Sequence, residues 1–547
     1  MSRTYTTYKA KFEKYGYVLV VLFAVLSWLP VIGVRFINDD YQILGYHAGK
    51  SWISLLQPFW SPDISNFYWR PLGNVIHPLI IHLAGFNPVV FRIVSVVIYS
   101  ACCLVIMRGG EKIGLSRSLA ILGAMLFAVL PSHELQVAWI ADQGEAIVTI
   151  FILLAFFSYS KYSRSNDSGF RQMVTYLIWI LAAVLVKESA FTAALIPLCY
   201  MVLKGDYSKT ALIRYSKDIL AGVLIIAIVL IYRWLIIGGT PFSSNHFSHG
   251  GPVRWIANFF IYIPLAIVPP ETLEFLTVKA HNLLLAVLFF IILSAIIIII
   301  IGVFKKTELS SRRKIAAAGV WFLIFVLPGL PTLMRWYVFT ASIGLLWMFF
   351  ILIDGVQAES YFRKISLWGI IAVILGVSAY DFLLMKRWES AGEKMETALT
   401  SLSMKENSIK SDSLYVWAIP DKVRRIPLMK LGIQETIQWG LNNKNITVIT
   451  PLRAEMNCIT SKISLVEKSD TSLIFHLNGG RFLMQGGESK SIIGDERITK
   501  TEDGLEYRIR TFIDKNNVPQ SIAGIRFLKS MRKDQLFYDG SGFTEVR

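Results

Sequence analysis

The feature that most constrains the fold is a series of long apolar runs in the first 390 residues. A bilayer core of ~30 Å requires roughly 17 to 23 helical residues to cross it. Runs of that length recur at residues 17–36, 88–107, 118–134, 143–160, 172–187, 188–203, 218–237, 282–304, 316–334, 337–353 and 365–385. Hydrophobic residues make up 54% of the chain and charged residues only 17%, which leaves more apolar surface than one soluble core can bury. The sequence therefore predicts a polytopic α-helical membrane protein with about eleven spanning helices, or more.

The distribution of lysine and arginine between these runs predicts how the chain is oriented in the membrane. Short loops that are rich in these residues tend to face the cytoplasm. Such loops are the N-terminal stretch and residues 108–117, 161–171, 204–217, 305–314 and 363–364. Eleven spans then put the N-terminus in the cytoplasm and the C-terminus outside, provided that the proline-rich segment 256–275 is re-entrant or interfacial. The net charge of +17 is largely a signal of this topology, so no nucleic-acid partner is expected.

The composition changes near residue 390, after the last apolar run. Short β-prone runs follow at residues 413–420, 445–450, 472–477 and 506–513, with turn residues between them. The Asp539-Gly540 pair is typical of a hairpin. We therefore predict a membrane domain at 1–389, with a long first outer loop at 37–87, and an extracytoplasmic domain at 390–547 that is α+β or β-rich.

Two adjacent carboxylates, Asp39 and Asp40, lie where the first apolar run ends. A charge inside lipid costs at least ~2.5 to 3.5 kcal/mol, so ionisable groups at a membrane boundary usually have a function or face a water-filled cavity. The alternative is that both residues only form the solvated cap of a helix. The predicted topology brings several further ionisable residues to the same membrane surface, namely Arg70, His133, Glu134, Asp142, Glu145, Lys187, Glu188 and Arg335.

This mixture of acids and bases is suited to transferring a group from a lipid phosphate. A hydroxyl becomes a good nucleophile when a carboxylate takes its proton, and a phosphate leaves well when cations absorb its growing charge. Arginine binds phosphate through a planar fork and lysine binds it as a point charge. Structural roles remain open: Arg70 and Arg335 as interfacial anchors, Lys187 and Glu188 as an ion pair closing a helix hairpin, and His133 as a packing residue.

The sequence contains no spacing of residues that specifies a metal or a cofactor. The four cysteines form no zinc motif, and no P-loop, G-x-S-x-G or H-E-x-x-H string is present. We therefore expect no cofactor and no metal. A divalent cation at Asp39 and Asp40 stays an open alternative, because hard cations prefer oxygen ligands, although adjacent carboxylates alone do not specify a site.

Five strings, in this order, resemble the membrane-embedded C-type glycosyltransferase superfamily. They are FINDDY, WRPL, LFAVLPSHELQVAWIAD, LVKESAFTAALIPL and MRWYVFTASIGLLWMF, and the resemblance covers roughly residues 17–385. Within that superfamily the chain is most similar to the protein O-mannosyltransferases that carry tetratricopeptide repeats, and to their bacterial relatives. The resemblance implies an inverting enzyme that moves a mannose-like hexose from a polyprenyl-phosphate donor to an extracytoplasmic protein, glycan or lipid acceptor.

The resemblance also implies roles for individual residues. Asp39 would be the general base, with Asp40 as the alternative. The donor phosphate would be bound by Arg70, Lys187 and Arg335. Glu188 would orient Lys187, and further support would come from His133, Asp142, Glu145, Tyr337 and Ser342.

The chain departs from the family pattern at three places. In the second span, Arg92, Ser95 and Tyr99 replace the relatives' histidines and asparagine. After AWI the relatives tend to have Gly-Arg-x-Asp, whereas this chain reads ADQGE at residues 141–145, and the tetratricopeptide repeats are replaced by residues 390–547. Two other functions stay open: an oligosaccharide ligase or polymerase that uses a polyprenyl-diphosphate donor, and a transporter of lipid-linked glycans. The transporter reading lacks the internal repeats that many such proteins show.

Overall fold

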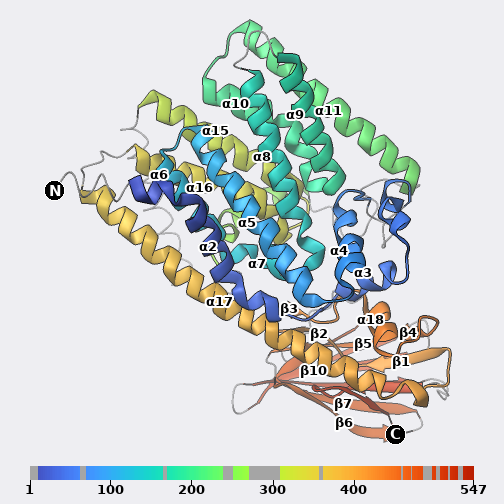
Figure 1. Cartoon of the computed structure of the whole chain (residues 1–547). Helices are drawn as coiled ribbons and strands as arrows, with labels where there is room; N and C mark the ends of the chain where they lie inside the picture. Colours follow the sequence, from blue (N-terminus) through green and yellow to red (C-terminus); the bar gives the residue numbers. More distant parts are fainter. Residues whose placement is uncertain are drawn as a thin grey trace. The chain divides into compact units, whose positions relative to one another are not determined.

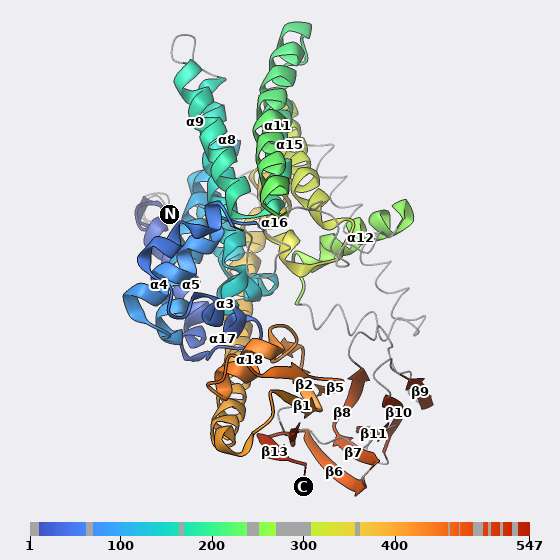
Figure 2. The ribbon, with the colours of Figure 1, turned by 90° about the vertical axis from the view of Figure 1, so that its right-hand side faces the viewer.

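The computed structural model divides the chain into two compact units (Figures 1 and 2). The membrane unit contains residues 1–29, 50–85 and 90–385, and the C-terminal unit contains residues 30–49, 86–89 and 386–547. The structure describes residues 10–61, 69–163, 169–237, 251–269, 308–355, 361–457, 460–469, 471–484, 496–500, 505–514, 518–527 and 534–546. The C-terminal unit thus includes the start of the predicted first outer loop, with Asp39 and Asp40, as well as the chain beyond residue 385.

The membrane unit is built from long helices joined by short 3-10 segments (Figure 1). Its α-helices are α2 (Gly16–Trp28), α4 (Ile76–Ala84), α5 (Pro88–Ile113), α6 (Arg117–Ala128), α7 (Glu134–Ala138), α8 (Gly144–Tyr162), α9 (Gly169–Val186), α10 (Ile196–Lys204), α11 (Lys209–Ile237), α12 (Pro252–Leu265), α15 (Leu309–Val326), α16 (Val338–Asp354) and the first part of α17 (Tyr361–Ser403). Helix α9 packs against both α8 and α11, and α15 packs against α16. The 3-10 segments are η2 (Trp52–Leu55), η3 (Gln57–Phe59), η4 (Gly73–Val75), η5 (Pro131–His133), η6 (Ile140–Asp142), η7 (Glu188–Leu195), η8 (Leu327–Gly329) and η9 (Arg335–Tyr337).

Seven of the described helices are long and apolar enough to cross a bilayer, and an eighth span results if one bent pair is counted. These segments are Gly16–Gly33, Pro88–Ile113, Ile140–Tyr162, Gly169–Val186, Lys209–Ile237, Arg335–Asp354, Ile365–Ser403 and the bent pair Arg117–Ala128 with Pro131–Ala138. The prediction of a polytopic membrane protein is confirmed. The predicted number of about eleven spans is not reached within the described residues, and the predicted span at 282–304 lies outside them.

Two predicted spans differ from the helices in the structure. Residues 188–203 form the 3-10 segment η7 and then the short helix α10, which has Pro197 in its first turn. Helix α15 covers the predicted span at 316–334 only as far as Val326; the 3-10 segment η8 follows, and its Pro328 has no backbone N–H with which to continue the α-helical hydrogen bonds. Both segments are apolar, as predicted. The length of an apolar run, however, does not predict the residue at which the α-helix begins or ends.

The bend between α6 and α7 is stabilised by side chains that bind the freed backbone carbonyls. The two helices meet at 55°, with Pro131 in the break. The Trp28 indole N–H donates to the carbonyl of Ala128 at 2.8 Å, and the Tyr99 hydroxyl lies 3.1 and 3.2 Å from the carbonyl oxygens of Phe127 and Ala128. In lipid every backbone polar group needs an internal partner, so these contacts make the bend tolerable.

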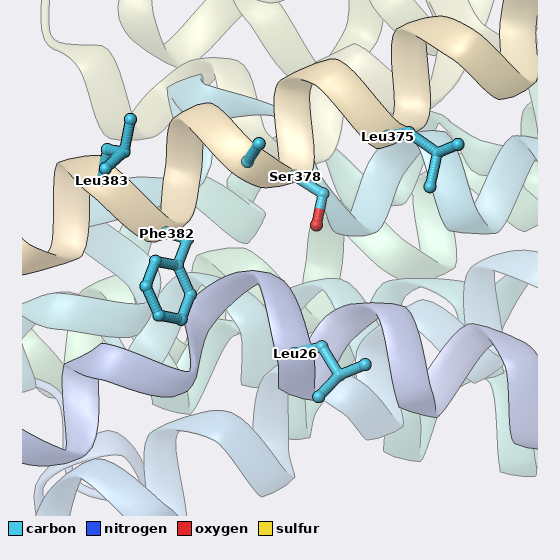
Figure 3. A pocket seen from close by; sticks show the side chains of 6 residues that line it. Leu26, Leu375, Ser378, Phe382 and Leu383 are labelled. Atoms are coloured by element: carbon cyan, nitrogen blue, oxygen red, sulfur yellow. The ribbon is translucent and has the colours of Figure 1, made fainter.

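An apolar cavity of about 440 Å³ lies between α2 and α17 (Figure 3). Its lining residues are Leu26, Leu375, Ser378, Ala379, Phe382 and Leu383. The one hydroxyl in this lining, that of Ser378, lies 2.7 Å from the Ser27 hydroxyl. With this lining the cavity is suited to hydrocarbon, and it offers no acid or base for chemistry.

The C-terminal unit is β-rich, as predicted. Its strands are β1 (Ser413–Trp417), β2 (Ile419–Val423), β3 (Ile426–Pro427), β4 (Thr447–Ile449), β5 (Leu452–Met456), β6 (Lys462–Ser469), β7 (Ser472–Asn478), β8 (Gly480–Met484), β9 (Glu496–Lys500), β10 (Leu505–Ile513), β11 (Pro519–Phe527), β12 (Asp534–Tyr538) and β13 (Phe543–Glu545). They form sheets in the orders β13-β12-β1-β4, β6-β7-β11-β10-β9 and β3-β2-β5-β8. The helical part comprises α3 (Asp40–His47), α18 (Ile433–Gly440), η10 (Glu406–Ser408) and the last part of α17.

The strands of this unit match the β-prone runs of the sequence. The runs at 413–420, 445–450, 472–477 and 506–513 contain β1, β4, β7 and β10. The predicted hairpin at Asp539-Gly540 joins the antiparallel strands β12 and β13. Gly540 has φ +104°, and the Asp539 carboxylate accepts hydrogen bonds from the backbone N–H groups of Ser541 and Gly542 at 2.7 and 2.9 Å. This is the turn chemistry that the residue pair indicated.

Candidate functional site

A buried ion cluster joins the ends of three elements in the membrane unit. Lys187 follows the last residue of α9, Asp142 ends η6, and Glu145 lies in the first turn of α8. The Lys187 ammonium lies 2.8 Å from a carboxylate oxygen of Asp142 and 2.8 Å from one of Glu145. The side chain of Gln136 donates to the other Asp142 oxygen at 2.6 Å, and the Ser189 hydroxyl donates to Glu145 at 3.1 Å. The lysine is thus held by two acids, each of which has a further partner.

Arg70 binds Glu188 next to this cluster. The Arg70 Nε donates to Glu188 Oε2 at 2.8 Å, and a second guanidinium nitrogen contacts the other carboxylate oxygen, so the pair is bidentate. The local backbone explains the pairing: the N–H of Leu72 donates to the carbonyl of Leu185 at 3.0 Å, and a Cβ on Gly73 would lie only 2.6 Å from the Val186 carbonyl oxygen. Glycine at position 73 therefore allows the Arg70 segment to lie against the end of α9.

Arg335 binds Glu134, the first residue of α7. The segment before Arg335 is fixed by Tyr262 of α12, whose hydroxyl lies 3.0 Å from the Thr332 carbonyl oxygen and accepts the N–H of Met334 at 3.0 Å. Trp336, the residue after Arg335, has its ring 5.6 Å from the Lys187 ammonium. This cation–π contact places the Arg335 segment against the ion cluster.

The three cations differ in how much of each side chain solvent can reach. The exposed fraction is 29% for Arg335, 19% for Arg70 and 4% for Lys187. In addition, the Nε of Arg335 is buried without a hydrogen-bond partner in the structure. Arg335 is therefore the cation best placed to accept an added anion, whereas Lys187 is enclosed by its two acids.

Charge balance controls the ionisation of Glu188, which lies just outside the spanning segments. Burial by itself raises the pKa of a carboxyl group, because it disfavours the charged form. The charge and hydrogen bonds of Arg70, followed by the charge of Lys187, outweigh this effect and lower the pKa of Glu188 to about 2. His77 of α4 shows the opposite balance: burial lowers its pKa to about 4, although its Nε2 lies 3.1 Å from the carbonyl oxygen of Ile140. Glu188 is thus anionic and His77 neutral near pH 7.

Two predicted supporting residues line the bent helix pair. His133 is fully buried, with its Nδ1 3.0 Å from the Tyr99 hydroxyl and its Nε2 3.4 Å from the Ser342 hydroxyl. Its ring contacts Phe339, with the two ring centroids 4.5 Å apart. Tyr337 is also buried, at the end of η9. His133 therefore packs in the interior of the membrane unit, and each of its ring nitrogens lies near a polar partner.

The predicted acids of the first outer loop lie in the C-terminal unit. Asp40 is the first residue of α3 and is fully buried, and its Oδ2 accepts the backbone N–H of Ile37 at 3.1 Å. Asp39, at the N-cap of α3, is only half-buried, and its Oδ1 accepts a hydrogen bond from the Asn38 side chain at 3.0 Å. Asp40 is therefore enclosed, whereas Asp39 keeps part of its surface exposed to solvent.

The structure corrects one pairing that the resemblance implied. Glu188 was expected to orient Lys187, but its hydrogen bonds go to Arg70, while Lys187 pairs with Asp142 and Glu145. The physical reason is that consecutive residues at the start of a 3-10 helix point in different directions, so the two side chains do not face each other.

Sequence reasoning missed polar and aromatic residues that contact the predicted residues within each unit. Gln136, Trp336 and Asn38 carry no charge, so the pattern of ionisable residues does not point to them. The strings PSHELQVAWIAD and MRWY contain Gln136 and Trp336 beside predicted residues, and FINDDY contains Asn38 beside Asp39. Adjacency to a predicted charged residue was the available signal.

Within the described part of the chain, no group of three or more His, Cys, Asp and Glu side chains is arranged to hold a metal ion. Asp39 and Asp40 differ in burial: Asp39 is half-buried and Asp40 is fully buried. A divalent cation at this pair stays a prediction.

Comparison with known proteins identifies membrane glycosyltransferases as relatives. The chain is 32% identical over 188 residues to the protein O-mannosyl-transferase TMTC1 of Homo sapiens, a match that covers 30% of this chain and 21% of that protein. It is 27% identical over 196 residues to the protein O-mannosyl-transferase Tmtc2 of Drosophila melanogaster, covering 33% and 21%. The chain thus spans about a fifth of the length of these curated relatives. No family model matches the sequence.

Among solved structures, the chain is similar to ArnT from Cupriavidus metallidurans bound to undecaprenyl phosphate. The sequence identity is 12%, the alignment covers 79% of this chain and 85% of that chain, and the TM-score is 0.44. The expected resemblance to the tetratricopeptide-repeat-type protein O-mannosyltransferases is confirmed by the sequence matches.

Proposed function

We propose that this protein transfers one sugar, a mannose-like hexose, from a polyprenyl-phosphate donor to an extracytoplasmic hydroxyl acceptor, with inversion at the anomeric carbon. The observation that carries the proposal is the set of three cations in the membrane unit, each paired with at least one acid. Fixed cations stabilise the charge that develops on a leaving phosphate without reorganising during the reaction. The names of the relatives, protein O-mannosyl-transferases, support the choice of sugar.

The cations would divide the work on the donor. Arg335 is the most exposed of the three and keeps a buried N–H donor without a partner, so we assign it the main contact with the donor phosphate. Arg70, already bidentate with Glu188, would add a second contact at its exposed edge. Lys187 would act on the donor phosphate through its charge without touching it, and it would hold the Arg335 segment through its contact with Trp336.

The acid in the mechanism would be Asp39. The acceptor O–H proton moves to the Asp39 carboxylate while the acceptor oxygen attacks the anomeric carbon. The bond between that carbon and the phosphate oxygen breaks, and the electron pair leaves with the polyprenyl phosphate. A positioned general base of this kind typically contributes about 10²- to 10⁴-fold to the rate. Asp40 is less suited, because it is fully buried and its Oδ2 binds the backbone of Ile37.

The proposal includes an orientation. The N-terminus would lie in the cytoplasm and the C-terminal unit on the other side of the membrane, where soluble nucleotide sugars are absent. A lipid-phosphate donor carries the energy for transfer to that side. The bilayer, the lipid-linked sugar and the acceptor are then the partners of the protein.

Donor choice tests this function. The purified protein in nanodiscs is incubated with a Ser/Thr-rich peptide and either polyprenyl-monophosphate mannose or a polyprenyl-diphosphate oligosaccharide, and release of the lipid phosphate is measured. We expect turnover of the monophosphate donor. Turnover of the diphosphate donor alone would indicate a ligase or polymerase instead, and turnover of neither would refute the proposal.

Donor binding tests the assignment of Arg335 separately from chemistry. A charge-assisted hydrogen bond is worth about 1.5 to 3 kcal/mol, so Arg335→Gln should weaken binding of the labelled donor by roughly 10- to 150-fold. Arg254→Gln is the matched control, because Arg254 is exposed on α12 of the same unit. Equal affinity in the Arg335 and Arg254 variants would mean that Arg335 has only a structural role.

A further inference from the structure

Asn38, the residue before Asp39, has an unusual backbone conformation and is completely buried. Its φ is +56°, in the left-handed region that favours glycine but that asparagine tolerates. Its exposed fraction is 0%. A buried polar side chain in this conformation persists only where its surroundings fix it.

The surroundings of Asn38 come from the loop before α18. The backbone N–H of Asn38 donates to the carbonyl of Leu428 at 2.6 Å, and its side-chain Oδ1 accepts the backbone N–H of Leu431 at 2.8 Å. Its Nδ2 then donates to Asp39 Oδ1 at 3.0 Å. One amide therefore connects the 428–431 backbone directly to the carboxylate of Asp39.

Gly432, at the end of the same loop, also lies close to Asp39. It is the N-cap of α18 and has φ +62°. A Cβ at this position would lie 3.2 Å from the Asp39 Cα and 3.1 Å from the Gln42 Cβ. Only a residue without a side chain fits here comfortably, so the backbone of the 428–432 loop lies against Asp39.

Helices α3 and α18 pack against each other and support this arrangement. The rings of Tyr41 on α3 and Trp439 on α18 lie 6.1 Å apart, and the Phe86 ring lies 5.0 Å from that of Trp439. All of these residues belong to the C-terminal unit, so the contacts are internal to one compact body. The orientation of the Asp39 carboxylate is thus set by residues nearly 400 positions away in the sequence.

We propose that Asn38 is a positioning residue, and that the 428–432 loop of the C-terminal unit acts through it to aim the Asp39 carboxylate. This inference rests on the proposed function, in which Asp39 is the general base. It gives the β-rich C-terminal unit a task in the reaction itself: the unit holds the base in its productive rotamer. Misplacing a catalytic group by about 1 Å can cost on the order of 100-fold in rate.

The test compares Asn38→Gly with Asn442→Gly in the full-length protein. Glycine accepts the positive φ at both positions, so neither exchange strains the backbone. Asn442 is the matched control, because it has φ +49° in the same unit but is exposed and contacts neither Asp39 nor its loop. We expect kcat of Asn38→Gly to fall about 10- to 100-fold with an unchanged KM for the donor, while Asn442→Gly behaves as wild type.

If Asn38→Gly does not fold, kcat of Asn38→Asp provides a second test. Aspartate tolerates the left-handed conformation and can still accept the Leu431 N–H, but it faces Asp39 with a carboxylate oxygen in place of the amide N–H, so the two acids repel each other or share a proton and Asp39 no longer acts as a free base. Its kcat, measured per folded protein, should fall at least 10-fold with the donor KM close to wild type. Wild-type kcat in both Asn38 variants would overturn the inference, as would a loss of activity that merely follows a loss of folded protein.

These outcomes are distinguishable from failure of the proposed function. If the wild-type protein turns over the donor and Asp39→Asn does not, but the Asn38 variants match wild type, only the positioning role fails. If Asp39→Asn retains full activity, the proposed function of Asp39 fails first.

Discussion

Removing the charge of Lys187 provides the sharpest structural prediction, because this side chain is only 4% exposed and has two acids at 2.8 Å. At an effective dielectric of about 20, two unit charges at this distance attract by roughly 6 kcal/mol. The cost of burying three charged groups offsets most of this attraction. Loss of one partner leaves buried charges without compensation, which typically destabilises by about 3 to 5 kcal/mol. We expect that loss for Lys187→Met.

A triple variant separates this electrostatic explanation from simple loss of packing. Lys187→Met combined with Asp142→Asn and Glu145→Gln removes all three charges and keeps the side-chain volumes similar. Replacing a complete buried ion set by neutral groups is often close to neutral in stability. Thermal unfolding midpoints in detergent should therefore be clearly lowered in the single variant and largely recovered in the triple variant.

The same variants also test how Lys187 acts on the donor. If the triple variant folds and still binds the labelled donor with near wild-type affinity, Lys187 supports the site and does not bind phosphate directly. A single variant as stable as wild type would refute the reasoning, and so would a triple variant no more stable than the single one.

Three further predictions follow from individual contacts. Arg335→Lys keeps the charge but loses the planar fork, so donor affinity should fall less than in Arg335→Gln yet stay below wild type, as measured by equilibrium binding. Tyr99→Phe leaves the carbonyls at the α6–α7 bend with one partner fewer and should destabilise the protein by about 1 to 3 kcal/mol in thermal unfolding; an unchanged midpoint would contradict this role. Burial raises the pKa of Glu455, but Lys422 and then Arg481 outweigh it and hold the pKa below the ordinary value of 4.5. Because this folded-state pKa is depressed, the stabilising contribution is present above pH 4.5 and is lost as the pH falls below it, so the stability gap between wild type and Glu455→Gln should close under acid; a constant gap would contradict the assignment.

Much of the fold could be predicted from the sequence, because hydrophobic length and strand alternation act locally. The apolar runs gave the spanning helices of the described residues, and the β-prone runs gave β1, β4, β7 and β10. Helix ends were less predictable: residues 188–195 form a 3-10 helix although their composition is that of a span. The composition of a segment predicts how favourably it transfers into lipid. Whether the segment forms an α-helix or a 3-10 helix depends on its tertiary contacts, here those at the ion cluster.

The candidate site was predictable as a set of residues but not as a set of pairs. Charged side chains at span ends could be selected one by one, since each is costly in lipid. Which acid meets which base depends on how segments such as 70–73 and 185–188 lie against each other, and no local pattern encodes that. The hydrogen bond from Leu431 to Asn38 is a stronger example, because its partners are separated by 393 positions in the sequence.

The most direct test of the account is the rate of lipid-phosphate release by Asp39→Asn in the presence of polyprenyl-monophosphate mannose and a peptide hydroxyl. Asp412→Asn serves as the control, because Asp412 is exposed in the same unit. We predict a loss of about 10²- to 10⁴-fold for Asp39→Asn, with donor affinity and folding unchanged, and no loss for the control. A rate for Asp39→Asn equal to that of the wild type would contradict the central claim.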